Sequence, residues 1–237
     1  MASNYQEVDN LLGTTYTWSN SIVEYVNTTH RGTLVEMVRR PGWGLSCYMD
    51  GTIQSCELDE KKYHQALVEP ILKSEPKTVC ILGGGEGATA RELFTDPFIC
   101  HVDMIEWDKD VVELFKTTYR QWSDGAFEDP RLHIEYEDVF SICNQKREYD
   151  GLVVDLFEPE DMEGEDCIKW LTSLIQIASW AKKSISIYAG MNSPFSESIG
   201  AKKIKLVLEM VGFKTIIQQK VYIPSFMGEC IFISGSK

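Results

Sequence analysis

The chain has 237 residues, of which 43% are hydrophobic and 25% are charged. This balance is typical of a soluble globular protein with one large domain, or one full domain and a small appendage. The formal charge of −13 argues against a nucleic-acid backbone as partner and is compatible with cationic ligands. Acidity that only aids solubility remains the simpler explanation of the charge taken alone.

The seven cysteines are scattered without a C-x-x-C pair, and the four histidines show no metal-ligand spacing. We therefore expect a reducing, cytoplasmic compartment and no metal. The polar, acidic start MASNYQEVDN resembles neither a secretory signal nor a basic transit peptide. No apolar stretch approaches the length of a membrane span, so we expect no membrane partner.

The amino-terminal part of the chain predicts a small antiparallel β-sheet. Residues 1–18 carry little periodicity and are expected to form a loose arm or a short helix. Short runs rich in β-branched or aromatic residues follow, at residues 22–26, 33–38 and 45–49. The Asp50-Gly51 pair predicts a hairpin turn, with residues 52–57 as its return strand.

A change of spacing marks the boundary between two predicted domains. Residues 58–72 show helical spacing of apolar residues, and Pro76 closes this segment. We therefore expect an N-terminal β-hairpin domain with a linking helix over residues 1–75, and a second domain over residues 76–237.

Beyond Pro76, apolar strand-like runs alternate with helical patterns. Such alternation predicts an α/β fold with a mostly parallel, doubly wound sheet that binds ligands at the carboxyl ends of its strands. The expected strands are residues 78–82, 102–106, 132–136, 151–155 and 184–189, the helices are 88–95, 109–118, 166–181 and 196–211, and a closing antiparallel pair covers 214–222 and 230–234.

A glycine-rich turn follows the first of these strands, within KTVCILGGGEGATAR at residues 77–91. Gly83, Gly84 and Gly85 would let a ligand approach the backbone closely. A nucleoside is the favoured ligand, because no Gly-Lys-Ser/Thr follows and the acidic Glu86 would repel a phosphate. A plain tight turn is the alternative for such a loop by itself.

Carboxylates follow the later strands of this domain. Glu106 lies about twenty residues after the glycine loop, where such folds bind the ribose hydroxyls. Asp138 follows the third strand and suits an adenine amino group, although a helix N-cap is the alternative. Asp155 and Glu158 belong to the acidic segment DLFEPED, whose mutual repulsion favours a bound cation.

The segments GGGEGATARE, IEWD, ED and DLFEP, with the upstream MDGTIQSCELDEKKYHQALVEP, resemble the polyamine aminopropyltransferases. This family comprises the spermidine, spermine and thermospermine synthases, and the ending VYIPSFMGECIFIS is most similar to the spermine and thermospermine branch. The resemblance spans residues 22–234. It implies an oligomerising β domain, as a homodimer or higher homo-oligomer, followed by a Rossmann-like, seven-stranded methyltransferase-type domain.

The resemblance also implies the substrates and the role of each site residue. Decarboxylated S-adenosylmethionine would be the co-substrate, a polyamine or similar amine the acceptor and 5'-methylthioadenosine the product, without a further cofactor. The nucleoside pocket would comprise Gln54, His64, Gly83, Gly84, Gly85, Glu86, Glu106, Asp138 and Val139. In this set Glu86 would face the aminopropyl amine, Glu106 the ribose and Asp138 the adenine.

On the acceptor side, the same resemblance implies that Tyr63 contacts the attacking amine, while Asp155 and Glu158 hold and deprotonate it. Glu229 would hold the far ammonium of a longer polyamine. Four positions depart from the family pattern: Glu158 replaces Asp, Glu24 replaces Gln, Gln65 replaces Glu, and AGMNSP replaces a glycine-rich segment.

Two other functions remain open at this point. An S-adenosylmethionine-dependent methyltransferase shares the domain, but an acidic Glu86 would oppose the methionine carboxylate that such an enzyme binds. A non-catalytic binding or partner subunit that keeps the nucleoside pocket would be compatible with the four departures.

Overall fold

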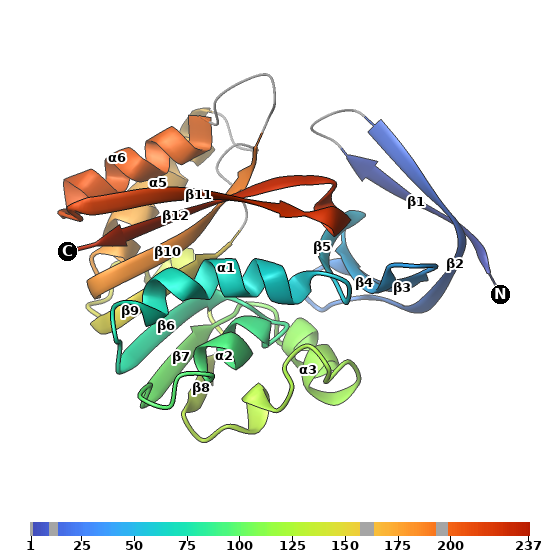
Figure 1. Ribbon diagram of the computed structural model, residues 1–237, viewed down its shortest axis with the longest axis horizontal. Coiled ribbons are helices and arrows are strands. Elements are labelled where there is room, and N and C mark those ends of the chain that lie inside the picture. The colour runs from blue at the N-terminus through green and yellow to red at the C-terminus, as the bar shows by residue number, and fades with distance from the viewer. Residues whose placement is uncertain (1, 10–13, 157–163, 193–198) are drawn as a thin grey trace. The chain divides into compact units, whose positions relative to one another are not determined.

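The computed structural model of the protein describes residues 2–9, 14–156, 164–192 and 199–237 (Figure 1). Contacts divide the chain into two compact units. The first comprises Met1–Tyr63 and Ile223–Met227, and the second comprises His64–Tyr222 and Gly228–Lys237. Most of the linking helix thus groups with the second unit, and the division of the domains at residue 75 stays a prediction.

The first unit is built on a five-stranded antiparallel sheet with the strands in sequential order. They are β1 (Ser3–Asp9), β2 (Thr14–Thr28), β3 (Leu34–Arg40), β4 (Gly44–Met49) and β5 (Thr52–Cys56). The expectation of an arm or helix over residues 1–18 is wrong, because β1 pairs with the first half of β2. Most β2 side chains are exposed or half-buried, so the strand lacks the alternating hydrophobicity that identifies a strand in a sequence.

A buried guanidinium lies at the centre of the first unit. Arg40 is 1% exposed, and its Cζ lies 4.3 Å from the ring centroid of Trp18 and 4.9 Å from that of Trp43. Its Nε donates to Ser46 Oγ at 3.0 Å. The indole N–H of Trp18 donates in turn to the buried Glu7 at 3.0 Å. Cation–π and hydrogen-bonding contacts therefore fasten the β1–β2 hairpin to the rest of this sheet.

The second unit contains a seven-stranded sheet in the order β11-β12-β10-β9-β6-β7-β8, in which β12 is antiparallel to β10. The neighbouring pairs from β10 to β8 are all parallel. The strands are β6 (Thr78–Gly83), β7 (His101–Ile105), β8 (Leu132–Glu135), β9 (Tyr149–Asp155), β10 (Ala181–Met191), β11 (Thr215–Ile223) and β12 (Gly228–Ser236). The predicted fold class is confirmed.

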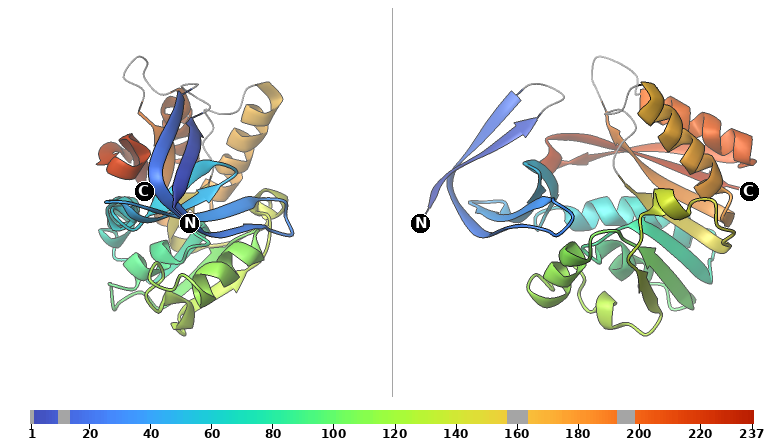
Figure 2. Two further views of the ribbon diagram at one scale, coloured as in Figure 1. Left: turned by 90° about the vertical axis from the view of Figure 1, so that its right-hand side faces the viewer. Right: turned by 180° about the vertical axis from the view of Figure 1, so that it is seen from behind.

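The linking helix α1 (Glu60–Leu72) precedes the first strand of this sheet. Helices α2 (Ala88–Leu93), α3 (Lys109–Thr117), α5 (Gly164–Ala178) and α6 (Ile199–Val211) follow strands as the alternation predicted, whereas the short helix α4 (Val139–Ile142) after β8 was not predicted. Helices α5 and α6 pack side by side against β10 (Figure 2). Among the described residues no helix is long and apolar enough to cross a membrane.

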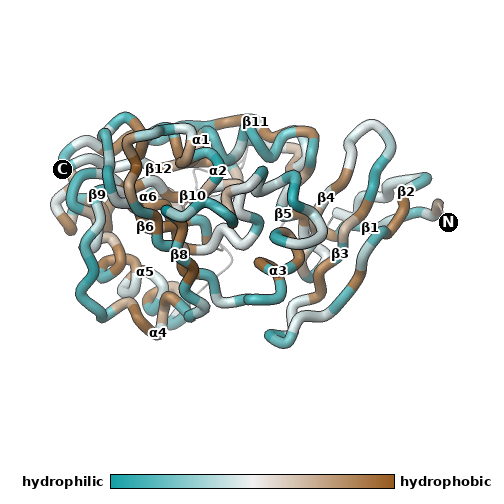
Figure 3. Tube along the Cα trace, turned by 90° about the horizontal axis from the view of Figure 1, so that it is seen from below, coloured by the Kyte–Doolittle hydropathy of each residue, from teal (hydrophilic) through white to brown (hydrophobic). Residues whose placement is uncertain are grey.

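The central strands β6 and β9 contain continuous runs of buried, mostly apolar residues. In β6 every residue after Thr78 is buried, and β6 is brown in the hydropathy view of Figure 3. Strand β9 has the same character from Gly151 to Val154. Burial on both faces produces such continuous apolar runs, whereas a half-exposed strand alternates. These apolar runs allowed the strands of the second unit to be predicted from the sequence.

The predicted boundary between α5 and β10 is misplaced. The helix expected to reach residue 181 ends at Ala178, and β10 already begins at Ala181. The turn between them closes through the amide of Trp180, which donates to the carbonyl of Ile177 at 3.0 Å. Neither glycine nor proline occurs in this turn, so the sequence carries no local stop signal there.

Replacing Gly83 with Ala should destabilise the protein by more than about 3 kcal/mol in urea unfolding, because an added Cβ would lie 2.2 Å from the Asp155 carbonyl oxygen. Gly212→Ala is the matched control, since Gly212 also has a positive φ of 94° but has open space around its Cβ position. The control should cost only about 1 kcal/mol. Equal losses in the two variants would contradict the steric explanation.

Candidate active site

The glycine loop connects β6 to α2 and lies beside the end of the neighbouring strand β9, at the centre of the sheet. Gly83 ends β6 with φ +84° and pairs in register with Asp155, the last residue of β9. Gly84 and Gly87 also have positive φ, and the Gly87 amide donates to the Gly84 carbonyl at 2.8 Å to close the turn before α2. The chain leaves β6 for β7 and β8 and then returns to β9, so this loop lies at the topological switch point of the sheet.

The loop also lies against the end of the next strand. A Cβ built on Gly85 would meet Glu106 Oε2 at 3.1 Å and a methyl group of Val111 at 3.0 Å. Glu86, the acidic member of the loop, is only 9% exposed. The Glu106 carboxylate therefore lies close to the glycine backbone, and the Glu86 side chain is largely shielded from solvent.

Glu106 directly follows β7 and is 9% exposed. Its amide donates to the Glu135 carbonyl at 3.0 Å, and its Oε1 accepts from the Asp108 amide at 3.0 Å. Burial raises the pKa of this carboxyl to about 7, although backbone N–H groups favour the charged form. Near neutral pH the group can therefore change between an acceptor-only carboxylate and a neutral acid.

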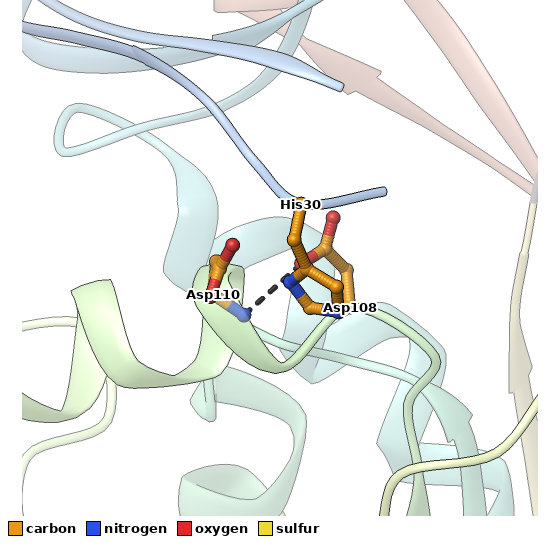
Figure 4. A group of neighbouring side chains, drawn as sticks. All are labelled: His30, Asp108 and Asp110. Atoms are coloured by element: carbon orange, nitrogen blue, oxygen red, sulfur yellow. Dashed lines mark hydrogen bonds between the residues drawn. The ribbon is translucent and has the colours of Figure 1, made fainter. Parts of the chain in front are cut away.

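Asp108 is a supporting residue to which the sequence analysis gave no role. It is 2% exposed and caps the N-terminus of α3, with its Oδ1 accepting from the Asp110 amide at 3.0 Å (Figure 4). Its own amide holds Glu106, so the cap connects the start of α3 to the Glu106 carboxylate. An Asp just before a helical pattern is the signal that predicts such a cap.

Asp138 is a helix N-cap, which was the alternative to an adenine contact in the sequence analysis. Its Oδ1 accepts from the Phe140 amide at 2.9 Å, at the start of α4, while the side chain as a whole is exposed. The next residue, Val139, is 5% exposed. Capping fixes the Asp138 carboxylate beyond the end of β8, and its predicted contact with adenine stays a prediction.

Further carboxylates occur at the ends of β9 and β10. Asp155 is half-buried at the end of β9. Glu229, near the start of β12, accepts from Asn192 Nδ2 at 2.9 Å, just beyond the end of β10. Glu158 lies outside the described residues. The structure thus brings most predicted residues of the second unit to one edge of one sheet, namely Gly83, Gly84, Gly85, Glu86, Glu106, Asp138, Val139, Asp155 and Glu229.

The remaining predicted residues lie on α1 and β5. Tyr63 is 8% exposed, and its ring lies edge-on to Phe226 with centroids 5.8 Å apart, within the first unit. Gln54, also in the first unit, is exposed and donates through Nε2 to the Thr52 carbonyl at 3.3 Å. His64 is 4% exposed in the second unit. Their participation in the nucleoside and amine sites stays a prediction.

One cluster in the second unit has the spacing of metal ligands. Asp103, His133 and Glu135 bring their ligand atoms within 4.8 Å of one another. Both oxygens of Glu135 already accept from Arg147, at 2.7 and 2.8 Å, and Asp103 Oδ2 accepts from the Tyr149 hydroxyl at 2.6 Å. These contacts account for the carboxylates without an ion, and the absence of a metal stays a prediction.

Comparisons with known proteins identify the relatives of this chain. Residues 60–235 match the family described as spermine/spermidine synthase domain. The polyamine aminopropyltransferase of Sulfurisphaera tokodaii is 30% identical over 220 residues, which is 91% of this chain and 71% of that protein. Polyamine aminopropyltransferase 2 of Hyperthermus butylicus is 41% identical over 126 residues, 52% of this chain and 41% of that protein.

A solved structure supports the same fold. A spermidine synthase in complex with the transition state analogue AdoDATO matches with a TM-score of 0.81 at 22% identity, over 99% of this chain and 80% of that chain. At this identity the likeness concerns the fold, and the spermine and thermospermine branch stays a prediction. Because the family match covers most of the chain and a relative agrees over nearly all of it, the protein belongs to the spermine/spermidine synthase family of polyamine aminopropyltransferases.

Proposed function

We propose that this protein transfers the aminopropyl group of decarboxylated S-adenosylmethionine to an amine acceptor and releases 5'-methylthioadenosine. The observation that carries the proposal is the gathering of Glu86, Glu106 and Asp155 around the glycine loop. Such a site attracts two cationic substrates, and a relative of the chain is named as an aminopropyltransferase of polyamines. Putrescine, spermidine and similar amines are the candidate acceptors.

In this proposal the nucleoside lies over the glycines at the end of β6. Glu106 accepts hydrogen bonds from the ribose hydroxyls, as a carboxylate at the end of the strand next to the glycine loop can do in a nucleoside-binding sheet. Asp138 and Val139 lie beside the adenine, and Gln54 and His64 complete the pocket. Glu86 faces the ammonium of the aminopropyl group. This contact favours decarboxylated S-adenosylmethionine, because the carboxylate of intact S-adenosylmethionine would be repelled by Glu86.

The chemistry requires alignment and removal of a proton. The amine nitrogen attacks the carbon next to the sulfonium, the C–N bond forms as the C–S bond breaks, and sulfur leaves as a neutral thioether. An alkylammonium has a pKa of about 10, so its proton must leave before attack. Asp155 and Glu158 would hold the acceptor and take this proton, while Tyr63 contacts the attacking amine and Glu229 the far ammonium of a longer acceptor.

The first unit supports a proposal about assembly. Val8 on β1 and Ile22, Val23 and Val26 on β2 are apolar, and between 40% and 59% of each is exposed. An exposed apolar strand surface of this kind is suited to association. We therefore place the homodimer or higher homo-oligomer on this sheet. The free cysteines, six of them buried, fit a reducing, cytoplasmic compartment.

The comparisons favour neither the methyltransferase nor the non-catalytic alternative. One assay separates the three functions, because their products differ. The protein is incubated with donor and with putrescine or spermidine, and 5'-methylthioadenosine is measured. S-Adenosylhomocysteine from intact S-adenosylmethionine would favour the methyltransferase, and neither product would favour a binding subunit.

Asp155→Asn should lower kcat/KM for the amine by roughly a hundredfold, because the amide cannot take the proton of the ammonium. Asp150→Asn is the matched control. Asp150 occupies the other end of β9, where its Oδ2 accepts from the Lys77 amide at 2.8 Å. The control should retain turnover, and an unchanged Asp155→Asn enzyme would remove Asp155 from the mechanism.

Glu106 should make nucleoside binding depend on pH near neutrality. Below a pKa of about 7 the carboxyl is neutral and accepts ribose hydrogen bonds less well. The Kd of 5'-methylthioadenosine, measured by calorimetry, should therefore rise about tenfold between pH 8 and pH 6. Glu106→Gln should bind weakly at both pH values, and a wild-type Kd independent of pH would contradict the ribose role.

The Glu106 carboxyl should also make the stability of the protein depend on pH, with the folded state becoming more stable as the pH falls. Its pKa is about 7 in the folded protein against an ordinary value of 4.5, so the folded state holds the proton more tightly. The stabilisation is complete below pH 4.5 and is lost as the pH rises to 7. Relative to Glu106→Gln, the wild-type free energy of unfolding should fall over this window by at most about 3 kcal/mol. Parallel pH profiles would contradict it.

A further inference from the structure

Asp59 belongs to the segment that resembles the family, yet the proposed reaction gives it no role. It is 6% exposed and lies directly before α1. Its carboxylate accepts two hydrogen bonds from one residue 166 positions away in the chain. Oδ2 accepts from the Ser225 amide and Oδ1 from the Ser225 hydroxyl, both at 2.7 Å. Short bonds to an ionised acceptor of this kind are among the stronger hydrogen bonds in proteins.

The two ends of this contact meet again at a pair of aromatic rings. The Asp59 carbonyl accepts from the Tyr63 amide at 3.3 Å, in the first turn of α1. Ser225 is followed by Phe226, whose ring meets the Tyr63 ring at 70° with centroids 5.8 Å apart. All four residues belong to the first unit. Asp59, Tyr63, Phe226 and Ser225 therefore form a closed loop of covalent, hydrogen-bonded and ring contacts.

The segment that carries Phe226 is a single tight turn. Pro224–Phe226 forms one turn of 3-10 helix, and Met227 follows with φ +55° and donates to the Pro224 carbonyl at 3.0 Å. Ser225 is 2% exposed in this turn. Ser225 and Phe226 are neighbours within one short turn. The hydrogen bonds from Ser225 to the Asp59 carboxylate therefore also fix the position of the Phe226 ring.

We propose that Asp59 and Ser225 are positioning residues that set the selectivity for the amine acceptor by fixing the Tyr63 and Phe226 ring pair. This inference rests on the proposed function, in which Tyr63 contacts the attacking amine. A fixed pair of rings gives the amine site a constant shape, which suits a methylene chain of one length. A loosened pair loses affinity for the preferred amine and discriminates less between amines of different length.

Three variants of the full-length protein test this role. Asp59→Asn places an amide N–H against the Ser225 donors, so the KM for the preferred amine should rise roughly tenfold. Ser225→Ala keeps the backbone N–H and should raise it only about threefold. Ser184→Ala is the control, because Ser184 is also 2% exposed and bonds to Ser74 Oγ at 2.8 Å, near the start of β10.

The decisive readout is the ratio of kcat/KM for putrescine to that for spermidine. In Asp59→Asn and Ser225→Ala this ratio should move towards one, while the KM for the donor stays within about twofold of wild type. The control should leave the ratio unchanged even if its melting temperature falls. The double variant should equal Asp59→Asn, because the two residues act as one unit.

A purely structural role would give a different result. It would lower the melting temperature and the active fraction, leave both KM values and the putrescine to spermidine ratio unchanged, and so overturn the inference. Calorimetric titration with the two amines keeps the test independent of turnover. The wild-type protein could form no product and still bind an amine more tightly than Asp59→Asn does. That result would support the inference and reject the proposed function. Equal amine binding by wild type and Asp59→Asn would overturn the inference.

Discussion

The close approach of β6 to β9 is the contact on which the rest of the second unit depends. Gly83 lies so near the Asp155 carbonyl that no side chain fits between them. This contact places a strand end, a tight turn and a helix start around one point, where the order of the strands reverses. A ligand at that point meets backbone from the loop and side chains from several strands, which is why parallel sheets bind ligands at such crossings.

Electrostatics then determines which ligands suit this place. Glu106 lies beside the glycines, and both it and Glu86, which is part of the loop, have little exposure to water. Burial makes the ionised form costly, which is the physical origin of the raised pKa of Glu106. Hydroxyl donors and cations relieve that cost, whereas phosphate would increase it. A ribose with a positively charged tail satisfies both conditions, and the relatives of the chain are enzymes that act in polyamine chemistry.

Two polar contacts organise the first unit in a comparable way. The Arg40 guanidinium among Trp18 and Trp43 ties the β1–β2 hairpin to its sheet. The bond between Asp59 and Ser225 ties a segment from the far end of the chain to the start of α1. Both use a buried charge whose partners are specific in geometry, so each holds its segment in one place rather than merely burying it.

The sequence by itself determined the doubly wound sheet, the glycine turn and the family, because buried strands are continuous apolar runs and the motifs are contiguous. It placed Glu106 and Asp155 at strand ends for the same reason. Only the tertiary structure decided that residues 3–9 and 14–18 belong to strands, that Asp108 supports Glu106, and that Asp59 meets Ser225. A strand such as β2, whose side chains are mostly exposed or half-buried, shows no regular hydrophobic alternation, and a bond between residues 166 positions apart depends on the folded chain rather than on local spacing.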